Sequence, residues 1–291
     1  MAGGRGEAVR EPRALILPAW GYYLVFLLAP LTFIFAYAFA RNTGFFEVQF
    51  GVSLANFRRL WDPVYLKIFR TTFSMALSGT LGCLAIGYPF AYWLATRPHK
   101  HKTLLLLLVV VPFWTSILIR TYAWALLLAG DGPLSRLLLR AHLIGSPLGI
   151  LNTSRAVWVG LVYDYLPLML FPLYVSIDRM DRSLVEASRD LGYGRLRTFR
   201  SVTLPLTLPG VLTGCLLVFV PMTGEYVVPS ILGGGKSALF GPIVGSQFLE
   251  AIDYPFGSAM ALSLVVVLLV VIVAYLRVLG RQAEANLGAV L

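Results

Sequence analysis

Long stretches of the 291-residue chain are hydrophobic and carry no charge. Five runs contain no Asp, Glu, Lys or Arg, and a sixth is interrupted only by Asp164. The runs are residues 14–40, 71–96, 103–119, 156–177, 201–224 and 254–276. A helix needs about 20 apolar residues to cross a bilayer core of roughly 30 Å, because lipid cannot pair exposed backbone groups. The pattern therefore predicts six spanning helices, at about 16–40, 68–96, 103–129, 154–177, 206–229 and 256–279.

Composition favours a membrane protein over a soluble one. Hydrophobic residues make up 58% of the chain and charged residues 13%, and the mean hydropathy is +0.77. A soluble domain could not hide so much apolar surface from water. The expected fold class is therefore all-α, as a polytopic membrane protein. The first run far exceeds the 7–15 residues typical of a signal peptide, so we expect an uncleaved first helix. Both cysteines, Cys83 and Cys215, fall in predicted spans and are expected to be packing residues.

Basic residues predict the orientation, because Lys and Arg accumulate on the cytoplasmic side of a membrane. Six arginines lie between residues 179 and 200, which places that segment in the cytoplasm and both termini with it. We expect cytoplasmic tails at 1–15 and 281–291 around one transmembrane domain at 16–280. The net charge of +10 is then explained by topology and lipid contact, without a nucleic-acid partner. The external loop 41–65 is too irregular to assign.

The cytoplasmic segment has a recognisable helix–turn–helix pattern. Asp181 or Ser183 can cap a first helix, and Glu186 stands three residues after Ser183 as in a capping box. Gly192 is suited to ending that helix. The first helix would carry an apolar stripe and the second would occupy 195–202. The stripe consists of Leu184, Ala187 and Leu191.

This segment resembles the EAA loop of permease subunits in binding-protein-dependent ABC importers, which have the type I permease fold. The matching pattern is Glu-small-small, then Gly, then hydrophobic-x-Leu-Pro, within a coupling loop at 181–205. Ser188 stands where the family usually has Ala. The residues expected to dock the ATPase are Glu186, Ala187, Ser188, Leu191, Gly192, Val202, Leu204 and Pro205. After them, Leu204-Pro205 would restart the chain into the fifth span.

The resemblance implies partners and excludes catalysis in this chain. It implies a cytoplasmic ATPase, expected as a homodimer, together with a second permease subunit and a periplasmic substrate-binding protein, all at the inner (plasma) membrane. Gly233–Ser237 looks like the end of a nucleotide-binding loop, but Ser230 replaces its first glycine, so ATP hydrolysis is expected in trans. His99 and His101 lack a third ligand nearby, so we expect no metal and no cofactor.

Five further motifs sharpen the resemblance toward the first permease subunit of spermidine/putrescine importers. They are Phe113-Trp114-Thr115-Ser116, Arg120-Thr121-Tyr122-Ala123-Trp124, Val162-Tyr163-Asp164-Tyr165-Leu166-Pro167, Gly224-Glu225-Tyr226-Val227-Val228-Pro229 and Tyr254-Pro255-Phe256-Gly257-Ser258-Ala259. Relatives of similar sequence carry phosphonates, opines or other amines, which stay open as cargo. A membrane enzyme would need a catalytic cluster that the sequence lacks. An ion-coupled secondary transporter would show related halves and would not need the coupling loop.

Three ionisable residues are predicted at membrane depth: Arg120, Asp164 and Glu225. Such groups are costly in lipid and usually face the bundle interior or a water-filled path. Polyamine ammonium groups need carboxylates and aromatic faces. We therefore expect Asp164 and Glu225 to line the translocation path. The aromatic candidates beside them are Tyr163, Tyr165, Tyr226, Trp114, Tyr122 and Trp124. The alternative is that Arg120 pairs with one of the carboxylates and only fixes helix packing.

Overall fold

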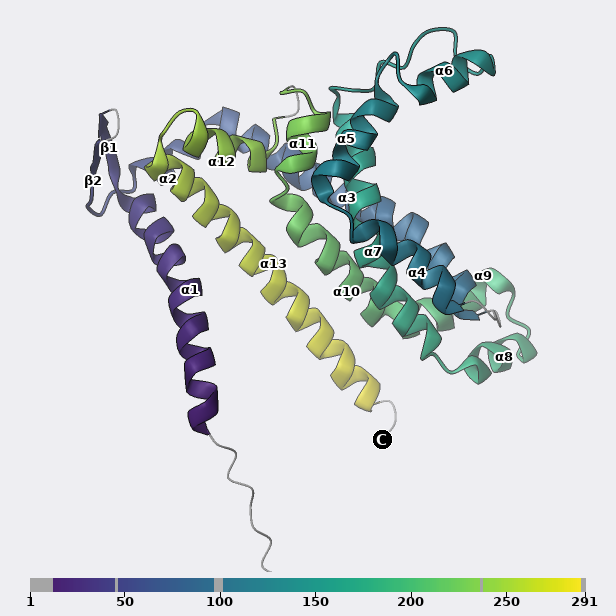
Figure 1. The fold of residues 1–291 in the computed structure, drawn as a ribbon. Helices are drawn as coiled ribbons and strands as arrows, with labels where there is room; N and C mark the ends of the chain where they lie inside the picture. Colours follow the sequence, from purple (N-terminus) through teal and green to yellow (C-terminus); the bar gives the residue numbers. More distant parts are fainter. Residues whose placement is uncertain (1–12, 45–46, 97–101, 236–237, 289–291) are drawn as a thin grey trace, which may run out of the picture. The chain divides into compact units, whose positions relative to one another are not determined.

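A computed structural model describes residues 13–44, 47–96, 102–235 and 238–288 (Figure 1). The chain divides into two compact units. The first comprises the residues up to Leu60 together with Gln247–Ser263, and the second comprises Trp61–Ser246 and the residues from Leu264 onward. The turn with His99 and His101, the end of the Gly233–Ser237 segment and most of the N-terminal tail lie outside the described residues. The predicted domain limits stay a prediction.

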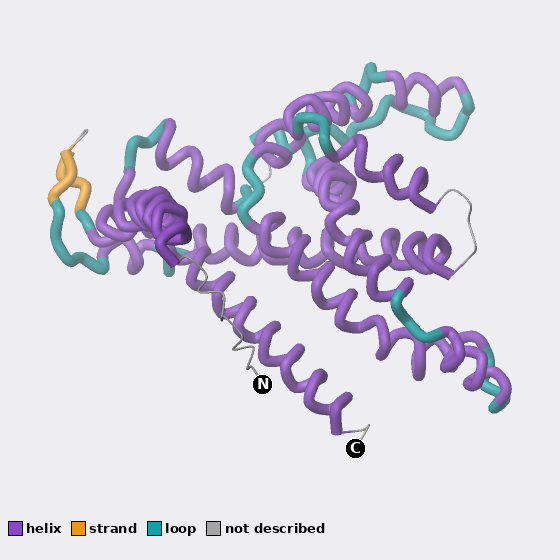
Figure 2. The backbone as a smooth tube through the Cα atoms, turned by 60° about the horizontal axis from the view of Figure 1, so that its bottom comes forward, coloured by secondary structure: helices purple, strands orange, loops and turns teal. Residues whose placement is uncertain are grey.

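Helices dominate both units, and one small hairpin is present (Figure 2). The elements of the first 113 residues are α1 (Arg13–Phe39), β1 (Arg41–Gly44), β2 (Glu47–Gln49), α2 (Ala55–Arg59), α3 (Pro63–Thr96) and α4 (Lys102–Phe113). The middle of the chain forms α5 (Ile117–Leu128), α6 (Pro133–Arg140), α7 (Ser154–Asp178), α8 (Arg182–Asp190) and α9 (Arg195–Thr198). The remainder forms the π-helical turn η1 (Phe199–Thr203), α10 (Leu204–Thr223), α11 (Val227–Leu232), α12 (Phe240–Leu249) and α13 (Tyr254–Gly288).

Helices of sufficient length and hydropathy for spanning agree in number with the prediction. Among the described residues five such helices are present, and a bent pair of shorter helices makes a sixth if it is counted as one span. The first, second, fourth and sixth predicted spans correspond to α1, α3, α7 and α13. Their apolar runs are long because each helix must extend across the bilayer core. They are helical because lipid offers no partner to backbone N–H and C=O groups.

In the first unit, the loop that the sequence left unassigned forms the hairpin and α2. β1 and β2 pair antiparallel, with Arg41 opposite Gln49. Asn56 of α2 donates from Nδ2 to the carbonyl oxygens of Ala38 and Ala40, at 3.0 and 2.8 Å. These two bonds attach α2 to the end of α1 and satisfy carbonyls that the helix end leaves free.

The core of the second unit forms where α3, α7 and α10 pack together. Buried side chains of this core include Cys83, Ala91, Leu161, Met169, Leu173 and Val218. Both cysteines are free, and Cys83 packs in the core as predicted. At Gly210 of α10 the helices approach closely, since an added Cβ would lie 2.3 Å from the Ser176 Cβ and 2.7 Å from the Pro172 carbonyl oxygen. Small residues at such positions let membrane helices pack backbone against backbone.

The third predicted span is not one helix. α4 ends at Phe113 and α5 begins at Ile117. The segments Lys102–Phe113 and Ile117–Arg140 differ in direction by 88°. The Thr115 backbone N–H and hydroxyl both donate to the Pro112 carbonyl oxygen, at 3.2 and 2.6 Å, which closes a turn. Pro112 itself has no N–H for a helical ladder. The prediction was wrong here because hydrophobicity continues through the break.

The fifth span also differs from the prediction. α9, η1 and α10 form one continuous helix from Arg195 to Thr223. The predicted restart at Leu204-Pro205 is therefore wrong. A proline cannot donate to the helical ladder, and a π-helical turn such as η1 is one way for a helix to pass an interrupted ladder. The span ends at Thr223, before Gly224, and the predicted end at residue 229 lies inside α11.

Candidate functional site

The predicted coupling loop folds as two short helices joined by a glycine turn. At the end of α8, the Tyr193 N–H donates to the Ser188 carbonyl at 3.1 Å and the Gly192 N–H donates to the Arg189 carbonyl at 2.8 Å. This pair of bonds is a Schellman motif, which requires a left-handed residue after the helix. Gly192 has φ +83°, a conformation that is costly for any residue with a Cβ. The glycine at this position is thus explained by the turn.

The start of α8 differs from the predicted capping box. Asp181 is the N-cap, and its Oδ1 accepts from the Ser183 N–H at 3.0 Å. This backbone hydrogen bond lowers the pKa of Asp181 below its usual value, since it favours the carboxylate. Of the two predicted N-caps, the structure therefore has Asp181. Ser183 lies inside the helix, so the predicted capping box between Ser183 and Glu186 was wrong. Glu186 is exposed, and no hydrogen bond or ion pair among the described residues involves its side chain.

Three leucine side chains of this loop face outward. Leu184, Leu191 and Leu196 are 46%, 79% and 64% exposed. The face of α8 that packs inward carries Val185 and Ser188 instead. All three residues of the predicted apolar stripe, Leu184, Ala187 and Leu191, are therefore solvent-accessible in the isolated chain. Of the other predicted docking residues, Val202 and Leu204 are half-buried and Pro205 is exposed. An exposed apolar patch with charged neighbours is typical of a protein contact.

Ser188, which departs from the alanine usual in the resembled family, has a partner. Its hydroxyl lies 3.1 Å from the Thr198 hydroxyl, and both residues are buried. Thr198 also donates to the Tyr193 carbonyl oxygen at 3.4 Å. The serine therefore joins α8 to α9, which keeps the two short helices in one arrangement.

Two contacts that the sequence did not predict attach this loop to the helices around it. Arg182 donates from Nη2 to the Ala95 carbonyl oxygen near the end of α3, at 2.7 Å. Tyr88 of α3 hydrogen-bonds Thr207 of α10 at 2.8 Å, and its ring packs edge-on against Phe199, with centroids 5.6 Å apart. These pairs are more than 85 positions apart in the chain, so no local pattern could reveal them.

A second cluster combines the three ionisable residues predicted at membrane depth. Arg120 Nε lies 3.1 Å from Asp164 Oδ1, and the two side chains are only 10% and 3% exposed. Of the two pairings that the sequence left open, the structure contains this one. Glu225 has other partners: its Oε2 accepts from the Tyr165 hydroxyl at 2.5 Å and its Oε1 from the Val227 N–H at 2.9 Å.

The Arg120–Asp164 pair is electrostatic rather than well hydrogen-bonded. Arg120 Nε and both carboxylate oxygens of Asp164 are buried and have no hydrogen-bond partner among the described residues. The guanidinium donates from Nη1 to the Pro112 carbonyl oxygen at 3.2 Å and lies 5.3 Å from the Phe113 ring. Arg120 therefore bridges the break between α4 and α5 to the middle of α7.

Aromatic residues predicted beside the path are only partly gathered. Trp124 packs edge-on against Tyr163, with ring centroids 5.3 Å apart. Tyr226, next to Glu225, is 44% exposed. Trp114 and Tyr122 are also exposed, at 83% and 58%. The carboxylate of Glu225 is thus accompanied by accessible aromatic surface from the same segment.

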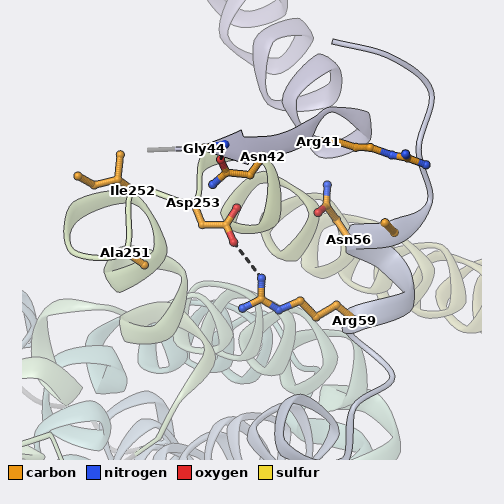
Figure 3. A pocket seen from close by; sticks show the side chains of 9 residues that line it. Arg41, Asn42, Gly44, Asn56, Arg59, Ala251, Ile252 and Asp253 are labelled. Carbon is orange, nitrogen blue, oxygen red and sulfur yellow. Dashed lines mark hydrogen bonds and ion pairs between the residues drawn. The ribbon is translucent and has the colours of Figure 1, made fainter. Parts of the chain in front are cut away.

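A pocket of about 690 Å³ in the first unit was not predicted (Figure 3). Residues of β1, α2 and the loop before α13 line it. Asp253 bonds Arg59 through Oδ2 at 2.9 Å and caps α13 by accepting the Phe256 N–H through Oδ1 at 3.3 Å. The preceding residue, Ile252, has φ +55°, which is unusual for a β-branched residue. The sequence gives no signal that would join residues 59 and 253.

Comparison with known proteins identifies the family. Residues 48–283 match the family described as the binding-protein-dependent transport system inner membrane component. The chain belongs to this family. It is therefore a multi-pass inner-membrane permease subunit, consistent with a role in transport and not in catalysis.

One relative and two solved structures are similar over nearly the whole permease. This chain is 41% identical to the spermidine/putrescine transport system permease protein PotB of Escherichia coli K12. The alignment of 273 residues covers 93% of this chain and 99% of PotB. The fold of this chain is similar to a bacterial ABC transporter that imports the acidic polysaccharide alginate, with TM-score 0.74, 15% identity, and 92% and 94% of the two chains covered. The same kind of transporter in complex with an alginate-pentasaccharide-bound periplasmic protein gives TM-score 0.72, 14% identity, and 90% and 91% coverage. The predicted fold class is confirmed.

Proposed function

We propose that this permease forms part of an ATP-driven importer for a polyamine such as spermidine or putrescine. The observation that carries the proposal is the 41% identity to PotB along 93% of the chain. A cationic cargo also suits the cluster at membrane depth, which contains two carboxylates, Asp164 and Glu225, and one cation, Arg120. The accessible ring of Tyr226, next to Glu225, can contact an ammonium group. We therefore propose that the cation path runs past this cluster.

The coupling loop is proposed to dock a separate cytoplasmic ATPase, expected as a homodimer. Three exposed leucines and the free carboxylate of Glu186 supply an apolar contact with a polar rim. Because α9, η1 and α10 are one helix, a displacement of the loop would be transmitted directly into the fifth span. The Tyr88–Thr207 bond would pass part of that displacement to α3. ATP hydrolysis would then move helices without bond chemistry in this chain.

The other proposed partners follow from the proposed role as an importer permease. A second permease subunit would complete the path, and a periplasmic binding protein would deliver cargo to the outer surface. With both termini in the cytoplasm, the pocket of Figure 3 would open toward the periplasm, because its residues follow α1 and precede α13.

Uptake by the reconstituted complex tests this function. Proteoliposomes containing the two permeases and the ATPase, supplied with the binding protein and ATP, should accumulate labelled spermidine, and omission of the ATPase should abolish uptake. Unlabelled putrescine should compete, whereas a phosphonate should not. Uptake that persists without the ATPase would indicate a secondary transporter, and uptake of the phosphonate alone would show that the assigned cargo is wrong.

A further inference from the structure

The carboxylates of the membrane cluster have different surroundings. Asp164 is enclosed and faces the guanidinium of Arg120, whereas Glu225 is half-buried and held by two neutral donors. We propose that Glu225 alone binds cargo, taking one ammonium group, and that the Arg120–Asp164 pair is a resident ion pair that positions the break between α4 and α5. The nature of the cargo in this inference rests on the proposed function.

Charge balance supports these different roles for Glu225 and for the Arg120–Asp164 pair. Asp164 faces the guanidinium of Arg120, whereas Glu225 forms no ion pair with a cation among the described residues. With one cation and two anions, the cluster retains one negative charge that no described residue neutralises. Charges at membrane depth are paired or face an aqueous path, since an unpaired one is costly. An ammonium group of the cargo would complete the balance, and it would do so at the carboxylate that has no cationic partner.

Hydrogen bonding and exposure favour Glu225 as the cargo ligand. A carboxylate offers about four acceptor positions, and the Tyr165 hydroxyl and the Val227 N–H use two of them. The remaining positions are available to an ammonium donor, and the exposed ring of Tyr226 provides an adjacent cation–π surface. Tyr165 is then a positioning residue, because its hydroxyl holds the carboxylate without facing the cargo charge.

Burial assigns a different role to Asp164. Its side chain is 3% exposed, so in this conformation a solute cannot reach its carboxylate. The arginine that neutralises it also bonds the Pro112 carbonyl oxygen, which is the acceptor of the turn at the helix break. The pair therefore links α7 to the break, and its two members depend on each other because a lone buried charge is far costlier than none.

Four variants of the complete importer test the division. The measurements are spermidine uptake at saturating cargo-loaded binding protein and, in parallel, ATPase stimulation by that protein. In E225Q, uptake should fall by about tenfold or more with stimulation retained, since a charge-assisted contact is lost while the fold is preserved. In Y165F the fall should be smaller. D164N should reduce the amount of assembled complex, and the R120Q/D164N double variant should restore both assembly and uptake.

The outcomes separate the possible roles. If R120Q/D164N assembles and hydrolyses ATP but loses uptake as E225Q does, Asp164 binds cargo and the inference is wrong. The inference is also wrong if E225Q transports normally, or if E225Q dissociates the permease pair, because Glu225 would then be neutralised by the second subunit. R120K is the conservative control, and it should retain assembly because the charge is kept.

A cargo-independent readout distinguishes failure of this inference from failure of the proposed function. The thermal stability of the purified permease complex should fall in D164N and recover in R120Q/D164N, whatever the solute. If wild-type importer moves no spermidine yet this recovery is observed, the assigned cargo is wrong and the resident ion pair stands. If D164N and the double variant are equally unstable, the pair does not exist as a unit.

Discussion

Replacement of Leu191 by alanine should weaken ATPase binding without destabilising the permease. This side chain is 79% exposed in the isolated chain, so little of it contributes to folding. If the ATPase covers it, truncation to alanine removes most of the 1.5–3 kcal/mol that burial of a leucine contributes, or about 2 kcal/mol. Since 1.4 kcal/mol corresponds to tenfold in affinity, the Kd for the ATPase should rise roughly 30-fold.

The assay is binding of the purified ATPase to the detergent-solubilised permease pair, with thermal unfolding of the pair measured alongside. Leu143 gives a matched control, because it is 71% exposed and lies between the third and fourth predicted spans, on the side opposite the cytoplasmic termini in the predicted topology. L143A should leave the Kd unchanged, and both variants should unfold within about 0.5 kcal/mol of wild type, as is usual for surface substitutions.

Two results would refute the reasoning about Leu191. An unchanged Kd in L191A would show that the exposed leucines are not the contact surface. An equal loss of affinity in L143A would show that the effect comes from general loss of surface hydrophobicity or from a wrong orientation of the loops. In either case the proposed docking surface would have to be sought elsewhere on the chain.

The remaining predictions concern the loop and the helix packing. G192A should loosen the turn after α8 by roughly 1–2 kcal/mol, since alanine must adopt φ +83° there, and amide exchange at residues 188–193 should quicken. G210A should destabilise the permease by about 1–3 kcal/mol in thermal unfolding because its Cβ would clash with α7, whereas G21A, with nothing within 4 Å, should not. S188A should cost about 1 kcal/mol through the lost Thr198 bond and should retain transport, and a complete loss of uptake would contradict this.

Much of the architecture was predictable because bilayer thickness imposes a minimum length on each span. Helices α1, α3, α7 and α13 coincide with apolar runs, and Gly192 marks the turn of the coupling loop as expected. The spacing of small residues, glycine and proline around this turn was enough to indicate the family. Local sequence was informative wherever local geometry decided the structure.

Other features depend on contacts between distant segments, and the sequence could not supply them. The break after Phe113 is hidden because the hydrophobic run passes through it, and Pro205 does not break its helix because a π-helical turn accommodates it. Choosing between the two possible partners of Arg120 required the packing of α5 against α7 and α11. The bond between Arg59 and Asp253 joins residues 194 positions apart.

Site-specific labelling of the coupling loop tests the central claim most directly. In a variant with Cys83 and Cys215 replaced by alanine, Glu186→Cys introduces one thiol at an exposed position of α8. The account predicts that this thiol reacts with a membrane-impermeant maleimide only from the cytoplasmic side, and that it crosslinks to the ATPase in the assembled importer. Labelling from the periplasmic side, or an assembled and active importer without the crosslink, would contradict it.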